Sequence, residues 1–283
     1  EDLRIEVAKR TSTTNIGMYF TSILSCYELG FISAINAIER IDKTIRTIEK
    51  LEHYEGHPLN WYDTETLQPL SPKYVSTVDS GNMLGSLWMV EQALNDYFLR
   101  PLVDSRCIER LRPTLRLLKD EIKKHHHQEN NLVYVLLDEI QNKLETNDSN
   151  DLLALYSKIE EVYLLATQFK DTLKDLQPSI DQSIYYWAKQ VEQQVNDWRI
   201  IFEHYLPWCD HFKKTIFLEV LANNENLQKI LIHLKHTPSL VQLADNAYSG
   251  MNYFFEKFPS LHIEQLTKWY SELQNLYKIS CER

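Results

Sequence analysis

The chain has 283 residues, a formal net charge of −10, and 43% hydrophobic and 25% charged residues. This acidic balance argues against a nucleic-acid partner, because phosphate binding depends on clustered Lys and Arg, whereas the basic residues here alternate with acidic ones. The four cysteines are far apart and lack Cys-x-x-Cys spacing, so we expect no disulfide framework, no metal site and no cofactor. No apolar run approaches the roughly 20 residues of a membrane span. The first residue, Glu1, is not Met, which suggests a segment of a longer protein.

Helical periodicity predicts three helices in the first hundred residues. The threonines of 11–14 supply cap oxygens for a helix over about 15–29, which Gly30 can end. A second helix over about 33–52 carries an apolar stripe of isoleucines every three or four residues. Asp79 and Ser80 are candidate caps for a third helix near 81–100. Its expected inward residues are Met83, Leu84, Leu87, Trp88, Val90 and Leu94.

From about residue 105 onward the whole sequence has a helical pattern. We expect helices over 107–146, 151–176, 179–204, 208–222, 224–236, 239–258 and 260–281, separated by proline- or asparagine-containing breaks. The many aromatic residues after Tyr185 recur at helical spacing and are expected to form core. No segment shows convincing β-alternation. The sequence therefore predicts an all-α fold.

The segment between Gly56 and Gly85 differs from the rest, because three prolines and three glycines interrupt it. Long irregular loops are uncommon in compact domains and are usually functional. This one contains residue types that bind carbohydrate, since indole and phenol rings pack on the apolar face of a sugar and carboxylates and amides bond its hydroxyls. They are Asn60, Trp61, Tyr62, Asp63, Tyr74, Ser76, Thr77, Asp79 and Asn82. The alternative is a structural loop, with an Asx-turn at Asp63 and a helix cap at Asp79.

Other candidate groups are weaker. Asp63, Glu65 and Asp79 are carboxylates in the same loop, as glycoside hydrolysis requires, although their separation cannot be read from the sequence. His125, His126 and His127 are consecutive, so on a helix they point in different directions and are expected to be solvated rather than to bind a metal.

Four sequence blocks occur here in the order found in one known family. They are Arg10-Thr11-Ser12-Thr13-Thr14-Asn15-Ile16-Gly17-Met18-Tyr19, Glu28-Leu29-Gly30-Phe31, Asn60-Trp61-Tyr62-Asp63-Thr64 and Tyr74-Val75-Ser76-Thr77-Val78-Asp79-Ser80-Gly81-Asn82. In these blocks the chain resembles the start of the middle, glycoamylase-like region of bacterial cyclic β-1,2-glucan synthases. Those large membrane-bound enzymes build β-1,2-glucan from UDP-glucose, close it into a ring and trim it by phosphorolysis. The resemblance weakens beyond Leu87, and Thr13 stands where the family pattern has proline.

The resemblance implies a fold and an organisation. The corresponding region of the family is an (α/α)6 toroid, related to β-1,2-glucanases and implicated in the transglycosylation that cyclises the glucan. We therefore expect residues 1–104 to form the N-terminal part of such a toroid, with the loop at its cleft. Residues 105–283 are expected to form an additional helical bundle.

The resemblance also implies roles. Trp61 and Tyr62 would stack on sugar, and Asn60, Asp63, Asp79 and Asn82 would hydrogen-bond glucose hydroxyls. The family's catalytic carboxylates lie in a later block with a Ser-Tyr-Tyr-Asp-Leu-Leu-type segment, which does not occur before Arg283, so this chain alone is expected to be inactive or nearly so.

Expected partners are β-1,2-glucan and other domains of the same polypeptide, on the cytoplasmic side of the bacterial inner membrane. This segment itself is expected to be soluble, with the membrane spans outside it. Two alternatives stay open at this point. One is a helical scaffold that docks other domains or a partner protein. The other is a β-1,2-glucan hydrolase that uses Asp63 and Asp79 as its carboxylate pair.

Overall fold

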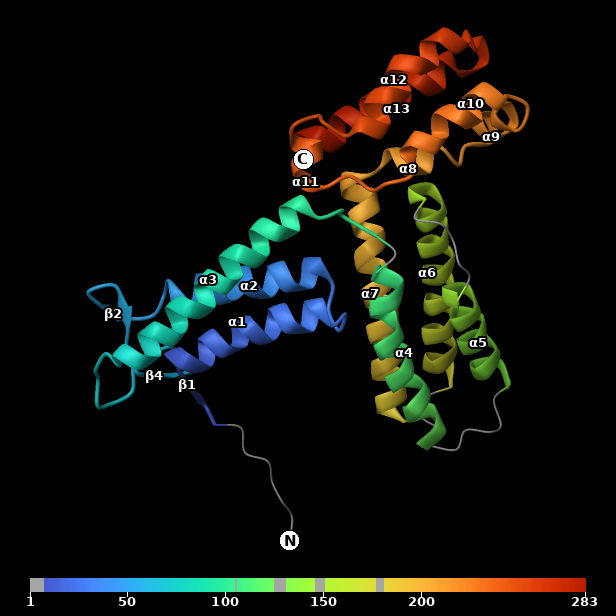
Figure 1. Ribbon diagram of the computed structural model, residues 1–283. Helices are drawn as coiled ribbons and strands as arrows, with labels where there is room; N and C mark the ends of the chain where they lie inside the picture. The colour runs from blue at the N-terminus through green and yellow to red at the C-terminus, as the bar shows by residue number, and fades with distance from the viewer. Residues whose placement is uncertain (1–7, 105, 125–130, 146–150, 177–180) are drawn as a thin grey trace. The chain divides into compact units, whose positions relative to one another are not determined.

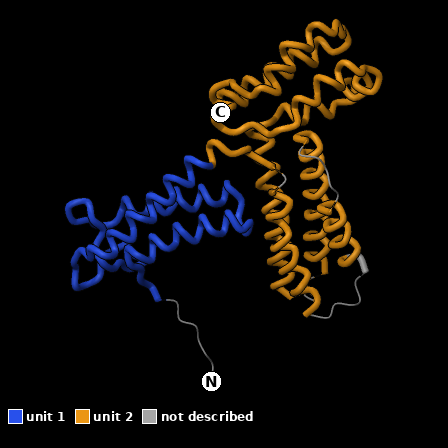
Figure 2. Tube along the Cα trace, viewed as in Figure 1, with its two compact units in different colours: residues 1–96 blue, residues 97–283 orange. Residues whose placement is uncertain are grey.

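The computed structural model describes residues 8–104, 106–124, 131–145, 151–176 and 181–283, and its ribbon is drawn in Figure 1. Helices dominate these residues and the strands are short, which confirms the all-α prediction. The chain divides into two compact units, Glu1–Asp96 and Tyr97–Arg283 (Figure 2). The assignment of 1–104 to a partial toroid and of 105–283 to an added bundle stays a prediction.

Over its described residues, the first unit contains three helices and two very small sheets. The helices are α1 (Thr13–Glu28), α2 (Ala34–Ile48) and α3 (Thr77–Leu99), and α3 continues three residues beyond the unit boundary. The strands are β1 (Arg10–Ser12), β2 (His53–Tyr54), β3 (His57–Pro58) and β4 (Trp61–Asp63).

The strands were not predicted, because pieces of two or three residues are too short to display alternation. β1 pairs antiparallel with β4, with Thr11 opposite Tyr62, and β2 pairs antiparallel with β3. The two residues between β2 and β3 both have positive φ angles, 49° at Glu55 and 82° at Gly56. That combination defines the turn whose twist matches a two-residue hairpin, and Gly56 accepts it without steric cost.

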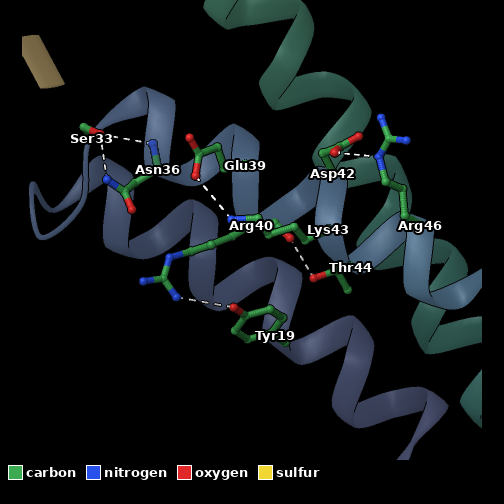
Figure 3. Close-up of polar contacts among 9 residues, drawn as sticks. All are labelled: Tyr19, Ser33, Asn36, Glu39, Arg40, Asp42, Lys43, Thr44 and Arg46. Carbon is green, nitrogen blue, oxygen red and sulfur yellow. Dashed lines mark hydrogen bonds and ion pairs between the residues drawn. The ribbon is translucent and has the colours of Figure 1, made fainter. Parts of the chain in front are cut away.

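Each helix of the first unit begins at a serine. Ser12 accepts from the backbone N–H of Asn15 at α1, and Ser33 accepts from that of Asn36 at α2 (Figure 3). Ser76 plays this part at α3, where its Oγ lies 3.2 Å from the backbone nitrogen of Asp79. The prediction that Asp79 and Ser80 cap α3 was therefore wrong, because the helix begins two residues earlier and both lie in its first turns.

The core of the first unit lies among its three helices. Phe20, Ile23 and Leu24 of α1 are buried, as are Ala37 and Ile41 of α2 and Met83 and Val90 of α3. α1 and α3 approach closely at Gly17, where an added Cβ would lie 2.8 Å from Ser86 Oγ and 3.4 Å from the Asn82 carbonyl oxygen.

The outer faces of these helices differ in chemistry. On α2, ion pairs join Lys43 to Glu39 and Arg46 to Asp42 one turn apart, in the spacing at which opposite charges on one helix face attract (Figure 3). On α3, Leu84 is 53% exposed and Trp88 is 63% exposed. The prediction that both point inward was wrong, since α3 buries only the narrow face that includes Met83, Ser86 and Val90.

The second unit begins with four long helices, α4 (Arg106–Lys124), α5 (Asn131–Glu145), α6 (Leu152–Asp175) and α7 (Gln182–Tyr205). α6 packs on α7, α4 on α7 and α5 on α6. The single helix predicted over 107–146 was wrong, because α4 ends at Lys124 and α5 packs on a different partner. His125, His126 and His127 lie outside the described residues.

Further helices, most of them short, complete the described part of the second unit. They are α8 (Trp208–His211), α9 (Thr215–Ala222), α10 (Glu225–Leu231), η1 (Ile232–Leu234), α11 (Leu240–Ala244), α12 (Ser249–Lys257), η2 (Phe258–Leu261), η3 (Glu264–Leu266) and α13 (Thr267–Glu282). The predicted helices over 208–222, 239–258 and 260–281 are thus each interrupted. The left-handed conformation of Asn246, with φ of 51°, marks the interruption between α11 and α12.

The aromatic residues of this C-terminal part form core, as predicted. Phe217 stacks on Trp269 with ring centroids 4.3 Å apart, and Phe212 packs edge-on against both rings. Trp208 is fully buried, whereas Tyr186 on α7 is 53% exposed and does not contribute.

Candidate functional site

The predicted sugar loop is anchored by a small core beneath it. Leu51, Leu59 and Tyr62 are buried together. Ile16 of α1 packs against this cluster, as do Leu67 and Val75 from the far side of the loop. The irregular segment therefore has an apolar anchor of its own, which fixes the backbone on both sides of Asn60 and Trp61.

Tyr62 belongs to this anchor. Its ring has no exposed surface. Its hydroxyl donates to the Glu52 carbonyl oxygen at 2.7 Å and accepts from the Leu59 backbone N–H at 2.5 Å. Successive strand residues point to opposite faces, so Tyr62 points into the core while Trp61 and Asp63 point the other way. A ring buried in this manner is not placed for the predicted sugar stacking.

Asn60 connects the loop to α3. In the amide orientation that matches donors to acceptors, its Oδ1 accepts from the Tyr74 hydroxyl at 2.6 Å and from Trp61 Nε1 at 3.1 Å. Its Nδ2 then donates to Asp79 Oδ2 at 3.1 Å. Asn60 is 8% exposed, so these bonds satisfy a polar side chain that would otherwise be costly to bury.

Asp79 connects the same network to α1. Thr14 Oγ1 donates to Asp79 Oδ1, and Asn82 Nδ2 donates to Thr14 Oγ1 at 3.0 Å. Asp79 and Asn82 are three residues apart, so they share one face of α3. The hydrogen bonds from the side chains of Ser76 and Thr14 hold the pKa of Asp79 below its ordinary value, which keeps this carboxylate ionised.

Asp63 lies in a separate group of contacts. Its Oδ1 accepts from the backbone N–H groups of Glu65 and Thr66, at 2.9 and 2.8 Å, and from the Thr66 hydroxyl at 3.0 Å. This is the Asx-turn that the sequence offered as its structural alternative. The bonds from Thr66 and Glu65 lower the pKa of Asp63.

Trp61 is half-buried on the outer side of β4. The guanidinium carbon of Arg10, on the paired strand β1, lies 5.0 Å from the centroid of the indole ring. The bond from its Nε1 to Asn60 fixes the ring from the other direction. The indole is therefore held in one orientation at the edge of the polar network.

Four of the six predicted site residues thus meet, namely Asn60, Trp61, Asp79 and Asn82. We call this group, together with Thr14 and Tyr74, the polar network. From the sequence, the threonines of 11–14 were expected only to cap a helix, whereas Thr14 lies in the first turn of α1 and reaches α3. The only sequence signal was its position in a block shared with a known family.

The carboxylates favour hydrogen-bond acceptance over proton donation. A general acid in glycoside hydrolysis needs a pKa that is raised toward neutrality. The pKa values of Asp63 and Asp79 are both lowered. The lowered pKa values therefore give no support to either residue as the general acid of a hydrolase.

A cavity of about 370 Å³ lies between α6, α7 and α8 in the second unit. Its charged lining groups are largely paired with one another. Arg199 bonds Glu160 at 3.3 Å and also Glu203, and the Tyr156 hydroxyl donates to Asp210 at 3.2 Å. We assign no ligand to this cavity, because these internal bonds account for its polar side chains.

The comparisons with known proteins concern only part of the chain. No protein-family model matches it. Among the described residues, no helix has the length and apolarity that crossing a membrane requires. Over 95 residues the chain is 43% identical to the cyclic beta-(1,2)-glucan synthase NdvB of Rhizobium meliloti (strain 1021), which is 34% of this chain and 3% of that protein. The similarity confirms the resemblance to a cyclic β-1,2-glucan synthase that the four sequence blocks predicted.

Proposed function

We propose that this chain supplies one wall of a glucan-binding cleft in a cyclic β-1,2-glucan synthase. The observation that carries the proposal is the polar network, in which Asn60, Asp79 and Asn82 meet at the edge of the Trp61 indole. The 43% identity to a protein named as such a synthase supports the choice of ligand. In this proposal α1, α2 and α3 are part of the family's (α/α)6 toroid.

The chemistry of the network suits a polyhydroxylated ring. Asp79 stays ionised and accepts hydrogen bonds from sugar hydroxyls, and Asn82 offers its carbonyl oxygen because its amide nitrogen is engaged with Thr14. The apolar face of a glucose residue packs on the indole of Trp61, on the side opposite Arg10. Tyr62 supports the loop from below. Asp63 contributes through Oδ2, because Oδ1 is engaged in its own turn.

The chemical steps belong to the complete protein in this proposal. Glucosyl transfer from UDP-glucose and ring closure by transglycosylation take place at the cytoplasmic side of the inner membrane. The catalytic carboxylates come from another part of the polypeptide. The isolated chain binds glucan without turning it over, and measurable transglycosylation by it would contradict this assignment.

Calorimetric titration with linear β-1,2-gluco-oligosaccharides tests the proposal. We expect the wild-type chain to bind them and the Trp61→Ala and Asn82→Ala variants to lose most of that affinity. Trp88→Ala is the matched control, since Trp88 lies nine residues beyond Asp79, which at about 3.6 residues per turn places it on the opposite side of α3. No binding by the folded wild-type chain, or binding that survives both substitutions, would contradict the proposal.

The scaffold alternative has one observation in its favour. Leu84 and Trp88, one turn apart on α3, are 53% and 63% exposed, and exposed apolar patches mark surfaces that bind other protein. In this second proposal α3 docks another domain of the same polypeptide. Sedimentation velocity, set beside the glucan titration, distinguishes the two proposals. Trp88→Ser should abolish self-association or docking without changing glucan affinity. Trp61→Ala should lower glucan affinity without changing self-association or docking.

A further inference from the structure

We infer that Thr14 is a positioning residue of the glucan site, which holds the Asp79 carboxylate and the Asn82 amide in the arrangement that meets the sugar. This inference rests on the proposed function and adds a residue that the sequence assigned only to the start of a helix. The Thr14 hydroxyl can adopt few hydrogen-bonding arrangements.

The direction of each bond at Thr14 is fixed. A hydroxyl has one hydrogen and an ionised carboxylate can only accept, so the Thr14 hydrogen must point to Asp79 Oδ1. The oxygen of Thr14 is then free only to accept, and it accepts from Asn82 Nδ2 at 3.0 Å. Asn82 must therefore present its carbonyl oxygen elsewhere. Among the described residues, no side chain or backbone group donates to that oxygen.

Asp79 is held from both sides. Asn60 of the loop bonds Oδ2, and Thr14 of α1 bonds Oδ1, so the carboxylate plane is set by two elements that α3 does not contain. The Ser76 side chain also bonds this carboxylate, so three side chains fix its orientation. Without the Thr14 hydroxyl the carboxylate keeps its contacts with Asn60 and Ser76 but loses the bond from α1, and the Asn82 amide loses the acceptor that sets its rotation.

Thr14 acts through its neighbours rather than on the sugar. Its hydrogen and one of its two lone pairs are already used within the polar network. The groups left with capacity for sugar hydroxyls are the Asp79 carboxylate and the Asn82 carbonyl oxygen. These two accept together from adjacent hydroxyls of one glucose residue only if both keep their orientations.

The test uses the full chain with Thr14→Val, which keeps the side-chain shape and removes the hydroxyl. Thr14→Ser is the conservative variant that restores the bonds, and Thr14→Ala is a second removal that favours the helix. Thr21→Val is the matched control, because Thr21 lies on the same helix and, among the described residues, its hydroxyl bonds only the Met18 carbonyl oxygen, at 2.9 Å. Circular dichroism and the amide NMR spectrum establish that each variant is folded.

Two measurements are made on each variant. Calorimetry with a linear β-1,2-gluco-oligosaccharide should give an affinity about tenfold weaker for Thr14→Val and Thr14→Ala, and unchanged for Thr14→Ser and Thr21→Val. A carboxyl NMR titration should give a higher pKa for Asp79 in Thr14→Val than in the wild type, because one of the bonds that lower it is gone. A residue that merely stabilises α1 would leave the Asp79 titration unmoved.

The outcomes separate this inference from the function on which it rests. If Asp79→Asn and Asn82→Ala lose glucan affinity while Thr14→Val keeps it, the positioning role is overturned and the glucan site stands. The same holds if the Asp79 pKa is identical in Thr14→Val and wild type. If the wild-type chain binds no glucan, or if Asp79→Asn and Asn82→Ala bind as well as wild type, the proposed function fails and the positioning role fails with it.

Discussion

Replacing Tyr62 with phenylalanine separates a structural role from a sugar-binding role for this residue. The substitution keeps the buried ring and removes only the hydroxyl, which accepts from the Leu59 N–H and donates to the Glu52 carbonyl oxygen. The Leu59 N–H is then buried without an acceptor, whereas the carbonyl of the exposed residue Glu52 can be rehydrated. A buried donor left unpaired costs about 1–3 kcal/mol and a lost ordinary hydrogen bond about 0.5–1.5 kcal/mol.

We therefore expect Tyr62→Phe to lower the free energy of unfolding of the first unit by about 2–3 kcal/mol. Urea unfolding followed by the indole N–H signals of Trp61 and Trp88 measures it, because both tryptophans lie in this unit. Tyr74→Phe is the matched control. Its hydroxyl donates to Asn60, but the residue is 49% exposed, so water replaces the bond and the loss should stay below about 1 kcal/mol.

Glucan affinity of folded Tyr62→Phe should equal that of the wild type. A loss of stability below about 0.5 kcal/mol, or no larger than that of Tyr74→Phe, would refute the buried-anchor reasoning. If Tyr62→Phe keeps the wild-type stability but loses glucan affinity, Tyr62 acts in the sugar site after all. At high pH the same anchor weakens, because burial raises the pKa of Tyr62 above its ordinary value. Its contribution is complete below the unfolded pKa near 10 and is lost as the pH rises through the higher folded pKa.

Three glycine substitutions test the backbone contacts, each by the urea midpoint and slope. Gly17→Ala should change the free energy of unfolding by less than about 0.5 kcal/mol, because the higher helix propensity of alanine offsets the displacement of the Ser86 hydroxyl. In a Ser86→Ala background the same substitution should stabilise the first unit by about 0.5–1 kcal/mol. Gly250→Ala should destabilise the second unit by about 2 kcal/mol or more, since its Cβ would lie 2.7 Å from the His233 carbonyl oxygen, and a neutral result would contradict that approach. Gly56→Ala meets no atom within 4 Å yet has a φ of 82°, so a cost of about 1 kcal/mol is expected from the backbone alone.

Helix content was predictable from the sequence because periodicity carries it over many residues. The stripes of α1 and α2 and the long helices α6 and α7 are each long enough to repeat the pattern several times. The extra interruptions inside the predicted helices over 208–222, 239–258 and 260–281 were not, since turns such as the one at Asn246 depend on a single residue in a left-handed conformation. Short helices also leave too few repeats for periodicity to locate their ends.

Burial on α3 was misjudged for a physical reason. Its apolar residues occur on more than one side, so periodicity alone does not say which side meets α1. The close approach at Gly17 decides it, because the backbone of α1 touches α3 at Met83 and Ser86 and leaves Trp88 facing away. A glycine in a sequence allows such close contact, but it does not indicate which helix makes the contact.

The candidate site, too, could be predicted from the sequence only in part. Asn60 and Asp79 could be chosen from the loop because their types suit a sugar, but Trp61 and Tyr62 looked equivalent until the short strand β4 set them on opposite faces. Thr14 could not be chosen from its type at all, since its bond to Asn82 spans 68 residues of sequence.

The packing at Gly17 explains both which face of α3 is buried and how Thr14 reaches Asp79. Gly17 follows Thr14 by one helical turn, and its missing side chain lets α1 lie close enough to α3 for the Thr14 hydroxyl to reach Asp79. A larger side chain at 17 would move the helices apart and lengthen the bonds to Asp79 and Asn82 at the same time. If the polar network binds glucan as proposed, Gly17→Leu should therefore weaken binding and raise the Asp79 pKa together, although Gly17 itself touches neither the carboxylate nor the sugar.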